Sequence, residues 1–595
     1  MKKSAAFLTA IALLICLISS VGASVFQTDF YSVTYYDKTF TTASGHKLDA
    51  LLLVPEGATE ETPAPGIVVS HGWYNNQEMQ DLNYVEYARR GYVVLAISMY
   101  GHGDSEVLPS NTWWDDANNA NGLYDGVKYL AELPCVDTSR IGVTGHSNGA
   151  MACREAVLQD HEGLIAAALL VSNDAVYYDE NGNFYNQFGT RDAGIVACQY
   201  DEFFHRVNGS APRDYINQVT AQSFLHFGVD PQGLEFRDAG FYTQEAEGQE
   251  IIRAIYNPAI THPWAHFSGD VVAFSVEFFD RALDAPVKLE PNDQIWQWKA
   301  AFNALGIVGF FLFVTFGTLA LLELPWFREL KAEQDVQPWP APEGKAKKRY
   351  WKSNIGGALW SIPLYFVGFI LGFVLAVPFW NQGASRVIGF WSVFCGLITL
   401  RSLRKAIRSG AVDPQERGIR ISGRVLAKTV VLALTVVCAA FCVVYVSDGL
   451  LLTDYRLWCF ATIRAFSPMH IPAILAFAPL WLFYYVVSGV AGNCVNYVRM
   501  GKHPRAAVLW QMFFSALGPV IMIVGQYLTF FATGKMVLDP LTGIMGIWLF
   551  PIAVILPLSV AVNHAIYRKT KNPYIGGIIM GLIACILTVT NTLTG

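Results

Sequence analysis

Charged side chains are scarce in this sequence. Only 15% of the 595 residues are Asp, Glu, Lys or Arg, whereas 53% are hydrophobic. A soluble domain carries about 25% charged residues, so this composition is typical of a membrane protein. The net charge of -6 provides no basic stripe for a phosphate backbone, and the sequence contains no nucleic-acid-binding motif. The composition therefore argues against nucleic acid as a partner.

Cysteine is also rare in the first half of the chain. Between residues 33 and 294 the only cysteines are Cys135, Cys153 and Cys198, and their spacing matches neither a zinc site nor a disulfide framework. Cys153 and Cys198 stand in apolar stretches, so we expect them to be buried thiols. No metal and no organic cofactor is predicted.

The chain has two unlike halves. Residues up to about 294 mix acidic, amide and aromatic side chains, whereas residues 300–595 are long apolar runs separated by short basic loops. The sequence thus predicts a soluble domain followed by a membrane domain. Residues 1–24 combine a basic start, an apolar run and small residues around Ala23, which is typical of a signal peptide or a retained signal anchor. Both alternatives export the domain that follows.

Eight candidate spans follow residue 300. The third is shorter than the about 20 residues that a bilayer crossing needs, so a re-entrant segment is its alternative. The spans are Ala300–Leu322, Ile355–Val377, Val387–Leu400, Thr429–Val446, Ile471–Ala491, Ala506–Phe531, Leu541–Val562 and Tyr574–Val589.

Basic residues are distributed unevenly among the loops between these spans. If all eight cross the bilayer, one side carries 21 Lys and Arg residues and the other carries four, namely Arg386, Arg456, Arg464 and Lys535. Because Lys and Arg in short loops remain in the cytoplasm, the soluble domain is predicted to lie outside it, in a multi-pass protein of the cell membrane.

Ionisable residues are missing from the spans themselves. None of the eight spans as drawn contains Asp, Glu, Lys or Arg. Ion-coupled transporters usually place such groups inside the bundle, so this absence argues against a transporter. We expect the membrane half to be an anchor or a bundle that contacts lipid.

The soluble part alternates short apolar runs with helix-length segments. Runs such as Gly66–Ser70, Tyr92–Ser98 and Ala166–Val171 are continuously apolar. Strands of this kind are typical of a parallel sheet covered on both faces. The predicted fold class is α/β, followed by an all-α transmembrane bundle.

The segment Arg140–Ala150 contains a G-x-S-x-G motif. An apolar strand leads into Gly145-His-Ser147-Asn148-Gly149, and a helix is predicted to begin near Ala150. A serine at such a sharp strand-to-helix turn has a strained backbone and an exposed hydroxyl, and the small residues on both sides let strand and helix approach. Ser147 is the predicted nucleophile.

Two further motifs resemble those of the α/β-hydrolase family. Gly66–Trp73 resembles the strand and H-G turn that carry the oxyanion hole, and Met99–Ser105 resembles the G-H-G-x-S turn, with Ser98 where many members have Asp. The resemblance covers about residues 33–284 and is closest to dienelactone hydrolases and acyl-peptidase-like members. It implies a serine hydrolase whose oxyanion hole is formed by the backbone N–H groups of Trp73 and Asn148.

The same resemblance implies a catalytic acid and base. Asp201 follows the apolar strand Gly194–Gln199 where the family places its acid, and Asp174 is the alternative. His262 lies closest to the end of the last strand, and His266 is the alternative base. The family order of serine, acid and histidine is thus available from Ser147, Asp201 and His262.

The expected activity is acyl transfer from an ester, or secondly a peptide or amide, to water. About residues 202–250 exceed what the family core needs and are interpreted as a cap, whose aromatic residues suit an apolar or acyl group. The expected partners are a small-molecule, lipid or peptide acyl substrate and the lipid bilayer. The rival hypotheses are a catalytically silent sensor or scaffold and a transport or lipid-handling protein with an accessory hydrolase domain.

Overall fold

The computed structural model describes residues 4–108, 120–206, 209–375, 377–501, 503, 505–537 and 542–592. Met1–Lys3, which supply the basic start of the predicted signal segment, lie outside the described residues, as do Lys502 and Leu541. Contacts divide the chain into two compact units. One contains residues 22–300, 526–544 and 591–595, and the other contains residues 1–21, 301–525 and 545–590. Residues 526–544, which the sequence analysis assigned to the membrane domain, thus group with the first unit.

A nine-stranded sheet forms the centre of the first unit. Its order is β1-β2-β4-β3-β5-β6-β7-β9-β8. The inner pairs from β4 to β9 are parallel, whereas β2 is antiparallel to both of its neighbours and β8 is antiparallel to β9. The strands are β1 (Val33–Thr41), β2 (Lys47–Pro55), β3 (Ala64–Ser70), β4 (Val93–Ile97), β5 (Val136–His146), β6 (Ile165–Val171), β7 (Asp192–Val196), β8 (Phe241–Ala246) and β9 (Gln249–Tyr256).

The inner strands are buried on both faces, as their apolar sequences require. Every residue of β3 and β4 is buried, whereas in the edge strand β1 only Val33 is buried and the other residues are half-buried or exposed. The predicted α/β fold with a mostly parallel sheet is confirmed. The sequence analysis did not assign the edge strand β8, which carries exposed polar residues and lacks the continuous apolar run of a central strand.

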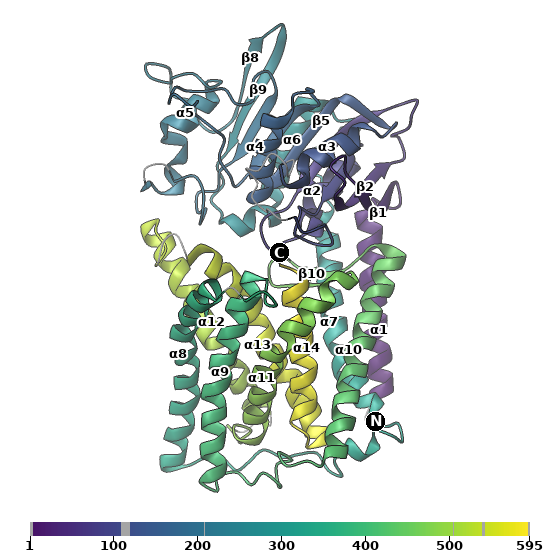
Figure 1. Ribbon diagram of the computed structural model, residues 1–595, viewed down its shortest axis with the longest axis vertical. Coiled ribbons are helices and arrows are strands. Elements are labelled where there is room, and N and C mark those ends of the chain that lie inside the picture. The colour runs from purple at the N-terminus through teal and green to yellow at the C-terminus, as the bar shows by residue number, and fades with distance from the viewer. Residues whose placement is uncertain are drawn as a thin grey trace. The chain divides into compact units, whose positions relative to one another are not determined.

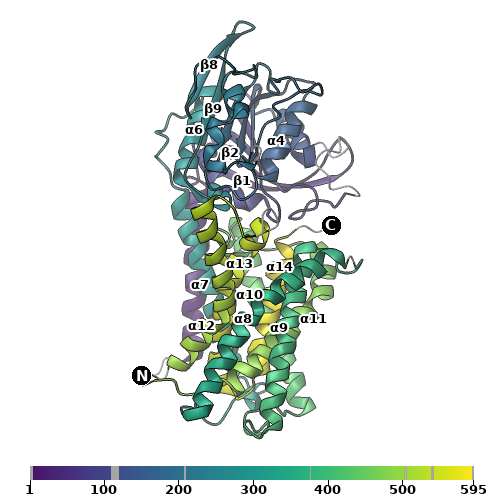
Figure 2. The same cartoon turned by 90° about the vertical axis from the view of Figure 1, so that its left-hand side faces the viewer.

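Helices cover both faces of this sheet. On one face α2 (Asp81–Arg89) and α6 (Gly269–Leu283) pack against the strands, and on the other α3 (Leu123–Ala131) and α4 (Asn148–Gln159) do so. Figure 2 shows α6 and α4 on opposite sides of the strands. Each face therefore has its own apolar core.

The stretch interpreted as a cap contributes to the core of the unit. It contains the short 3-10 helix η5 (Pro212–Asn217), α5 (Val219–Leu225) and β8. Tyr215, Phe224 and Leu225 are buried in the same apolar cluster as the strands and α4. The stretch thus carries a sheet edge and a core helix.

The second unit is helical (Figure 1). Eight helices of the described residues are long and apolar enough to cross a membrane, counting the N-terminal α1 (Ala5–Gln27), which fits a multi-pass membrane protein. The short third candidate span lies within a 26-residue helix, α9, so its length suffices for a crossing. The remaining helices are α7 (Trp296–Leu321), α8 (Gly344–Val374), α9 (Gly383–Arg408), α10 (Gly423–Leu451), α11 (Ile471–Cys494), α12 (Ala506–Thr533), α13 (Thr542–Thr570) and the shorter, 17-residue α14 (Tyr574–Thr590).

The helix α1 packs closely within the membrane unit. Ser20 forms a buried hydrogen bond of 2.8 Å with Ser447 of α10, and the Ser19 hydroxyl donates to the carbonyl of Phe302 in α7 at 2.6 Å. A Cβ added at Gly309 would lie 2.7 Å from the sulfur of Cys16. Small residues thus let α1 and α7 approach, as in other membrane bundles.

Candidate active site

Ser147 lies at a sharp turn between β5 and α4. Its backbone has φ 60° and ψ -116°, outside the regions that residues with a side chain usually adopt. Its N–H donates to the carbonyl of Val171 at the end of β6, at 2.8 Å, which fixes the turn against the sheet. The strain predicted from the motif is therefore present in the described backbone.

The two glycines of the motif make this turn possible. A Cβ at Gly145 would lie 2.5 Å from the carbonyl carbon of Gly149, and a Cβ at Gly149 would lie 2.5 Å from the carbonyl oxygen of His71. Both distances are too short for any side chain. Strand, turn and helix can therefore approach only with glycine at both positions.

The H-G turn after β3 lies directly against the nucleophile. A Cβ at Gly72 would lie 3.2 Å from the Cβ of Ser147. The His71 ring holds the turn, because its Nε2 accepts the N–H of Met99 at 3.0 Å. Trp73 follows this turn, and Asn148 is the first residue of α4, where backbone N–H groups are not used within the helix. Asn148 thus directly follows Ser147, and Trp73 follows the glycine that approaches it; their N–H groups as an oxyanion hole stay a prediction.

Asp201 and His262 are paired in the structure. Asp201 follows β7 and is fully buried, and its Oδ2 accepts a hydrogen bond of 2.9 Å from Nδ1 of His262. Its Oδ1 accepts the N–H groups of Phe203 and Phe204, each at 2.8 Å. Burial alone would raise the pKa of Asp201, but His262 and these hydrogen bonds hold that pKa below its usual value. Asp201 is therefore an ionised carboxylate that fixes the tautomer of His262.

His146 connects His262 to the turn that carries Ser147. Its Nε2 donates to the carbonyl of His262 at 2.9 Å, and the two rings lie 4.5 Å apart. Burial, together with His262 and His266, lowers the pKa of His146 well below its usual value, so this ring is neutral. His262 thus lies next to the residue that precedes Ser147.

His266, the alternative base, packs on the other side of this cluster. Its ring lies 4.6 Å from that of His146, and burial lowers its pKa to about 4. Within the described part of the chain neither of its ring nitrogens has a hydrogen-bond partner. His262 therefore has a carboxylate to orient it, and His266 does not.

Asp174, the alternative acid, forms a second Asp–His pair. Its Oδ1 lies 2.9 Å from Nδ1 of His205, and its Oδ2 accepts the N–H of the same residue at 3.1 Å. Burial alone would lower the pKa of His205, but Asp174 raises it. Tyr177 also donates to Asp174, at 3.0 Å. The structure thus joins Asp174 to a histidine that the sequence analysis did not name.

The sequence analysis also missed Glu202. Its Oε2 accepts the backbone N–H of His262 at 2.8 Å, and its side chain is buried. Burial and the adjacent Asp201 raise the pKa of Glu202, to about 7, against the effect of His262. An acid beside Asp201 in a polar loop has the pattern of a solvated side chain, so the sequence carried no signal for this contact.

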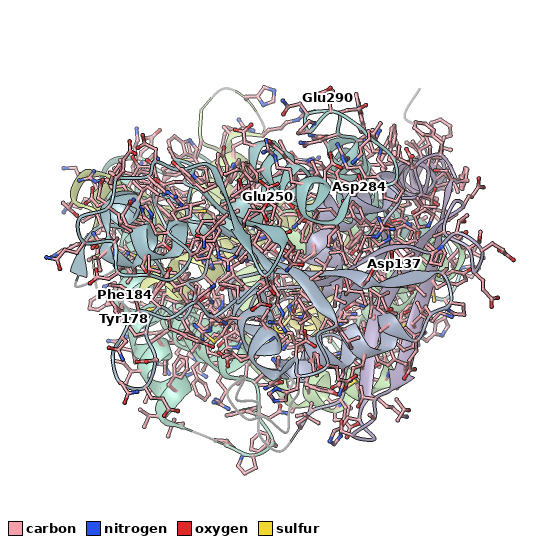
Figure 3. All side chains as sticks on the ribbon, turned by 90° about the horizontal axis from the view of Figure 1, so that it is seen from above. Asp137, Tyr178, Phe184, Glu250, Asp284 and Glu290 are labelled. Atoms are coloured by element: carbon pink, nitrogen blue, oxygen red, sulfur yellow. The ribbon has the colours of Figure 1, made fainter. Side chains whose placement is uncertain are left out.

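Two further local interactions fix other segments of this unit. Arg140, which begins the apolar part of β5, donates to Asp137 at 2.7 Å. On the loop between β6 and β7, the rings of Tyr178 and Phe184 lie 5.0 Å apart, and Figure 3 shows these two side chains next to each other. Among the described residues, no group of three His, Cys, Asp or Glu could hold a metal ion.

A serine at a strained strand-to-helix turn, beside a buried Asp–His pair and on a mostly parallel sheet, defines the class of α/β hydrolases. The family model that matches residues 44–247 is X-Pro dipeptidyl-peptidase (S15 family). The fold and this match identify the N-terminal part of the chain as an α/β hydrolase, joined to apolar helices that fit a membrane domain.

Solved structures that match part of the chain include three hydrolases. The α/β hydrolase GrgF from Penicillium sp. sh18 is 15% identical, with a TM-score of 0.29, and the match covers 42% of this chain and 99% of that chain. An acetyl xylan esterase from Paenibacillus sp. R4 is 14% identical, with a TM-score of 0.29 and coverage of 42% and 85%. A Pyrobaculum calidifontis esterase is 14% identical, with a TM-score of 0.29 and coverage of 47% and 94%. No curated protein matches the chain.

Proposed function

We propose that this protein is a membrane-bound serine hydrolase that transfers an acyl group from an ester or amide to water on the extracytoplasmic side. The observation that carries the proposal is the strained Ser147 turn beside the buried pair of Asp201 and His262. A hydrolase of the α/β type is the class supported by the fold and by the family match. The roles of individual residues and the side of the membrane are proposals.

The chemistry begins with removal of a proton from the serine hydroxyl. His262 takes the proton of Ser147 on Nε2, while its Nδ1–H donates to Asp201. The serine oxygen forms a bond to the substrate carbonyl carbon, and the carbonyl oxygen becomes an oxyanion. The backbone N–H groups of Asn148 and Trp73 stabilise this negative charge.

The intermediate then collapses. The bond from carbon to the leaving group breaks, and the leaving group takes the proton from His262. Water attacks the acyl-enzyme, with His262 again accepting a proton, and the acid product leaves Ser147 with its hydroxyl restored. Each step uses only side chains and backbone groups of this chain, the substrate and water.

A second candidate function is peptide hydrolysis. The family match to X-Pro dipeptidyl-peptidases over residues 44–247 favours it. Comparing hydrolysis of p-nitrophenyl acetate with that of Gly-Pro-p-nitroanilide separates the two candidates. If kcat/KM for the anilide exceeds the value for the ester, the protein is a peptidase rather than an esterase.

Labelling with a fluorophosphonate tests the proposed function directly. We expect a membrane-impermeant reagent to label the wild-type protein in intact cells and to leave Ser147→Ala unlabelled. The Ser147→Ala protein should also lose ester hydrolysis while its circular dichroism spectrum stays unchanged. Equal labelling of both proteins would refute Ser147 as the nucleophile, and labelling of the wild type only after lysis would refute the extracytoplasmic location.

A further inference from the structure

A segment far away in the sequence packs along the loop that carries Asp201. The described part of this segment is residues 526–537 and 542–544, which belong to the same compact unit as residues 22–300. The ring of Phe531 lies 5.0 Å from that of Tyr200, and Arg206 lies 5.4 Å from the ring of Phe530. A Cβ at Gly543 would lie 2.7 Å from Phe203. The segment therefore follows the loop on both sides of Asp201.

Within this contact, Glu202 forms a hydrogen-bonded bridge between Tyr527 and the backbone of His262. Its Oε1 accepts the hydroxyl of Tyr527 at 2.7 Å, and its Oε2 accepts the backbone N–H of His262 at 2.8 Å. Both carboxylate oxygens are thus used, one on the distant segment and one on the histidine loop. The three groups are buried, so water does not compete for these hydrogen bonds.

The bridge suits an ionised Glu202 because both of its neighbours donate. Burial and Asp201 raise the pKa of Glu202 to about 7, although His262 and the Tyr527 hydroxyl act in the opposite direction, so the carboxylate form dominates above about pH 7. Without the tyrosine hydroxyl, one oxygen of a buried carboxylate loses its donor. Such a loss is costly, and the loop relaxes to recover a partner.

We propose that Tyr527 is a positioning residue for the hydrolase: acting through Glu202, it fixes the backbone of His262 so that the imidazole stays aligned between Asp201 and Ser147. This inference rests on the proposed function. It also assigns residues 526–544 a part in the chemistry, in contrast to the expectation that the membrane half only anchors the hydrolase. A protein that ends near Asp293 lacks this segment and is expected to lose its activity on small soluble esters.

The substitution Tyr527→Phe removes only the hydroxyl. The ring of Tyr527 lies 5.9 Å from that of Phe531, and Phe keeps this contact. The rings of Phe203 and Phe204 lie 4.8 Å and 5.7 Å from that of His262, and they also remain. The variant is therefore expected to fold, with the histidine loop less tightly fixed.

The test uses the full-length protein in detergent and measures kcat and KM on p-nitrophenyl acetate. The variants are Tyr527→Phe, Glu202→Leu and the double substitution. The matched control is Tyr365→Phe. The buried Tyr365 hydroxyl likewise donates a hydrogen bond, of 2.8 Å, to the carbonyl of Met545, and both of these residues belong to the helical unit, away from Glu202.

We expect Tyr527→Phe to lower kcat about tenfold or more, with KM nearly unchanged, and Tyr365→Phe to match the wild type. The double substitution should be no slower than Glu202→Leu alone, because Tyr527 acts through Glu202. A wild-type kcat in Tyr527→Phe, or effects that multiply in the double variant, would overturn the proposal.

Hydrogen exchange separates this proposal from the proposed function. The His262 amide should exchange faster in Tyr527→Phe than in the wild type or in Tyr365→Phe, because its acceptor is less firmly held. Unchanged exchange would overturn the bridge even in an active enzyme. If the amide exchanges faster but Ser147→Ala is as active as the wild type, the bridge holds and the serine mechanism fails.

Discussion

Asp201 and Asp174 allow a sharp test of the site, because each carboxylate lies 2.9 Å from the Nδ1 atom of a histidine. In Asp201→Asn the side-chain oxygen will keep the position of Oδ1, where it accepts the N–H groups of Phe203 and Phe204. The amide nitrogen then faces Nδ1 of His262. Since both atoms would otherwise be donors, the imidazole must move its proton to Nε2.

This change of tautomer removes the base. Nε2 is the atom that should accept the serine proton, so a proton already on Nε2 prevents the first step. The corresponding substitution in a serine protease lowers kcat about 10,000-fold, which equals about 5.4 kcal/mol of transition-state stabilisation. We expect Asp201→Asn to lose kcat on p-nitrophenyl acetate by about this factor, with little change in KM.

Asp174→Asn is the matched control. Asp174 bonds both the ring and the backbone of His205, so its substitution should cost about 1–3 kcal/mol of stability and lower kcat only about threefold. Thermal melting followed by circular dichroism measures the first effect, and steady-state kinetics measures the second. A fully active Asp201→Asn together with an inactive Asp174→Asn would refute the reasoning and make Asp174 and His205 the acid and base.

Three further predictions concern the base, the N-terminal helix and the orientation. His262→Ala should lower kcat about a thousandfold or more and His266→Ala far less, because of these two histidines His262 alone bonds a carboxylate. Kinetics on the same ester measures both effects, and the reverse order would show that His266 is the base. The helix α1 should stay in the mature protein, because Ser20 is hydrogen-bonded inside the membrane unit. N-terminal sequencing of the purified protein measures where the mature chain begins, and a start near residue 24 would contradict retention of α1. Single cysteines placed in residues 328–352 and 401–428 should react with an impermeant maleimide only after lysis, because basic loops stay in the cytoplasm. Reaction in intact cells would show that these loops face outward and would contradict the predicted orientation.

Local patterns in the sequence were enough to predict the fold class. Continuous apolar strands must be covered on both faces, so runs such as Gly66–Ser70 predicted the parallel sheet, and the long apolar runs after residue 300 predicted a multi-pass membrane protein. The glycines around Ser147 predicted the strained turn, because only glycine tolerates contacts as short as those at Gly145 and Gly149. These features depend on near neighbours in the chain, so the sequence alone determined them.

Contacts between distant residues were decided only by the tertiary structure. A carboxylate such as Glu202 has the same local pattern whether it faces water or a buried partner, and Tyr527 lies in an apolar run that predicts a membrane span. Likewise, Asp174 and Asp201 both follow apolar strands, and the family resemblance favoured Asp201 with His262, but nothing in the sequence indicated that Asp174 bonds His205. Hydrogen bonds of this kind form between groups that only the folded chain brings within 3 Å, and no periodicity along the sequence encodes them.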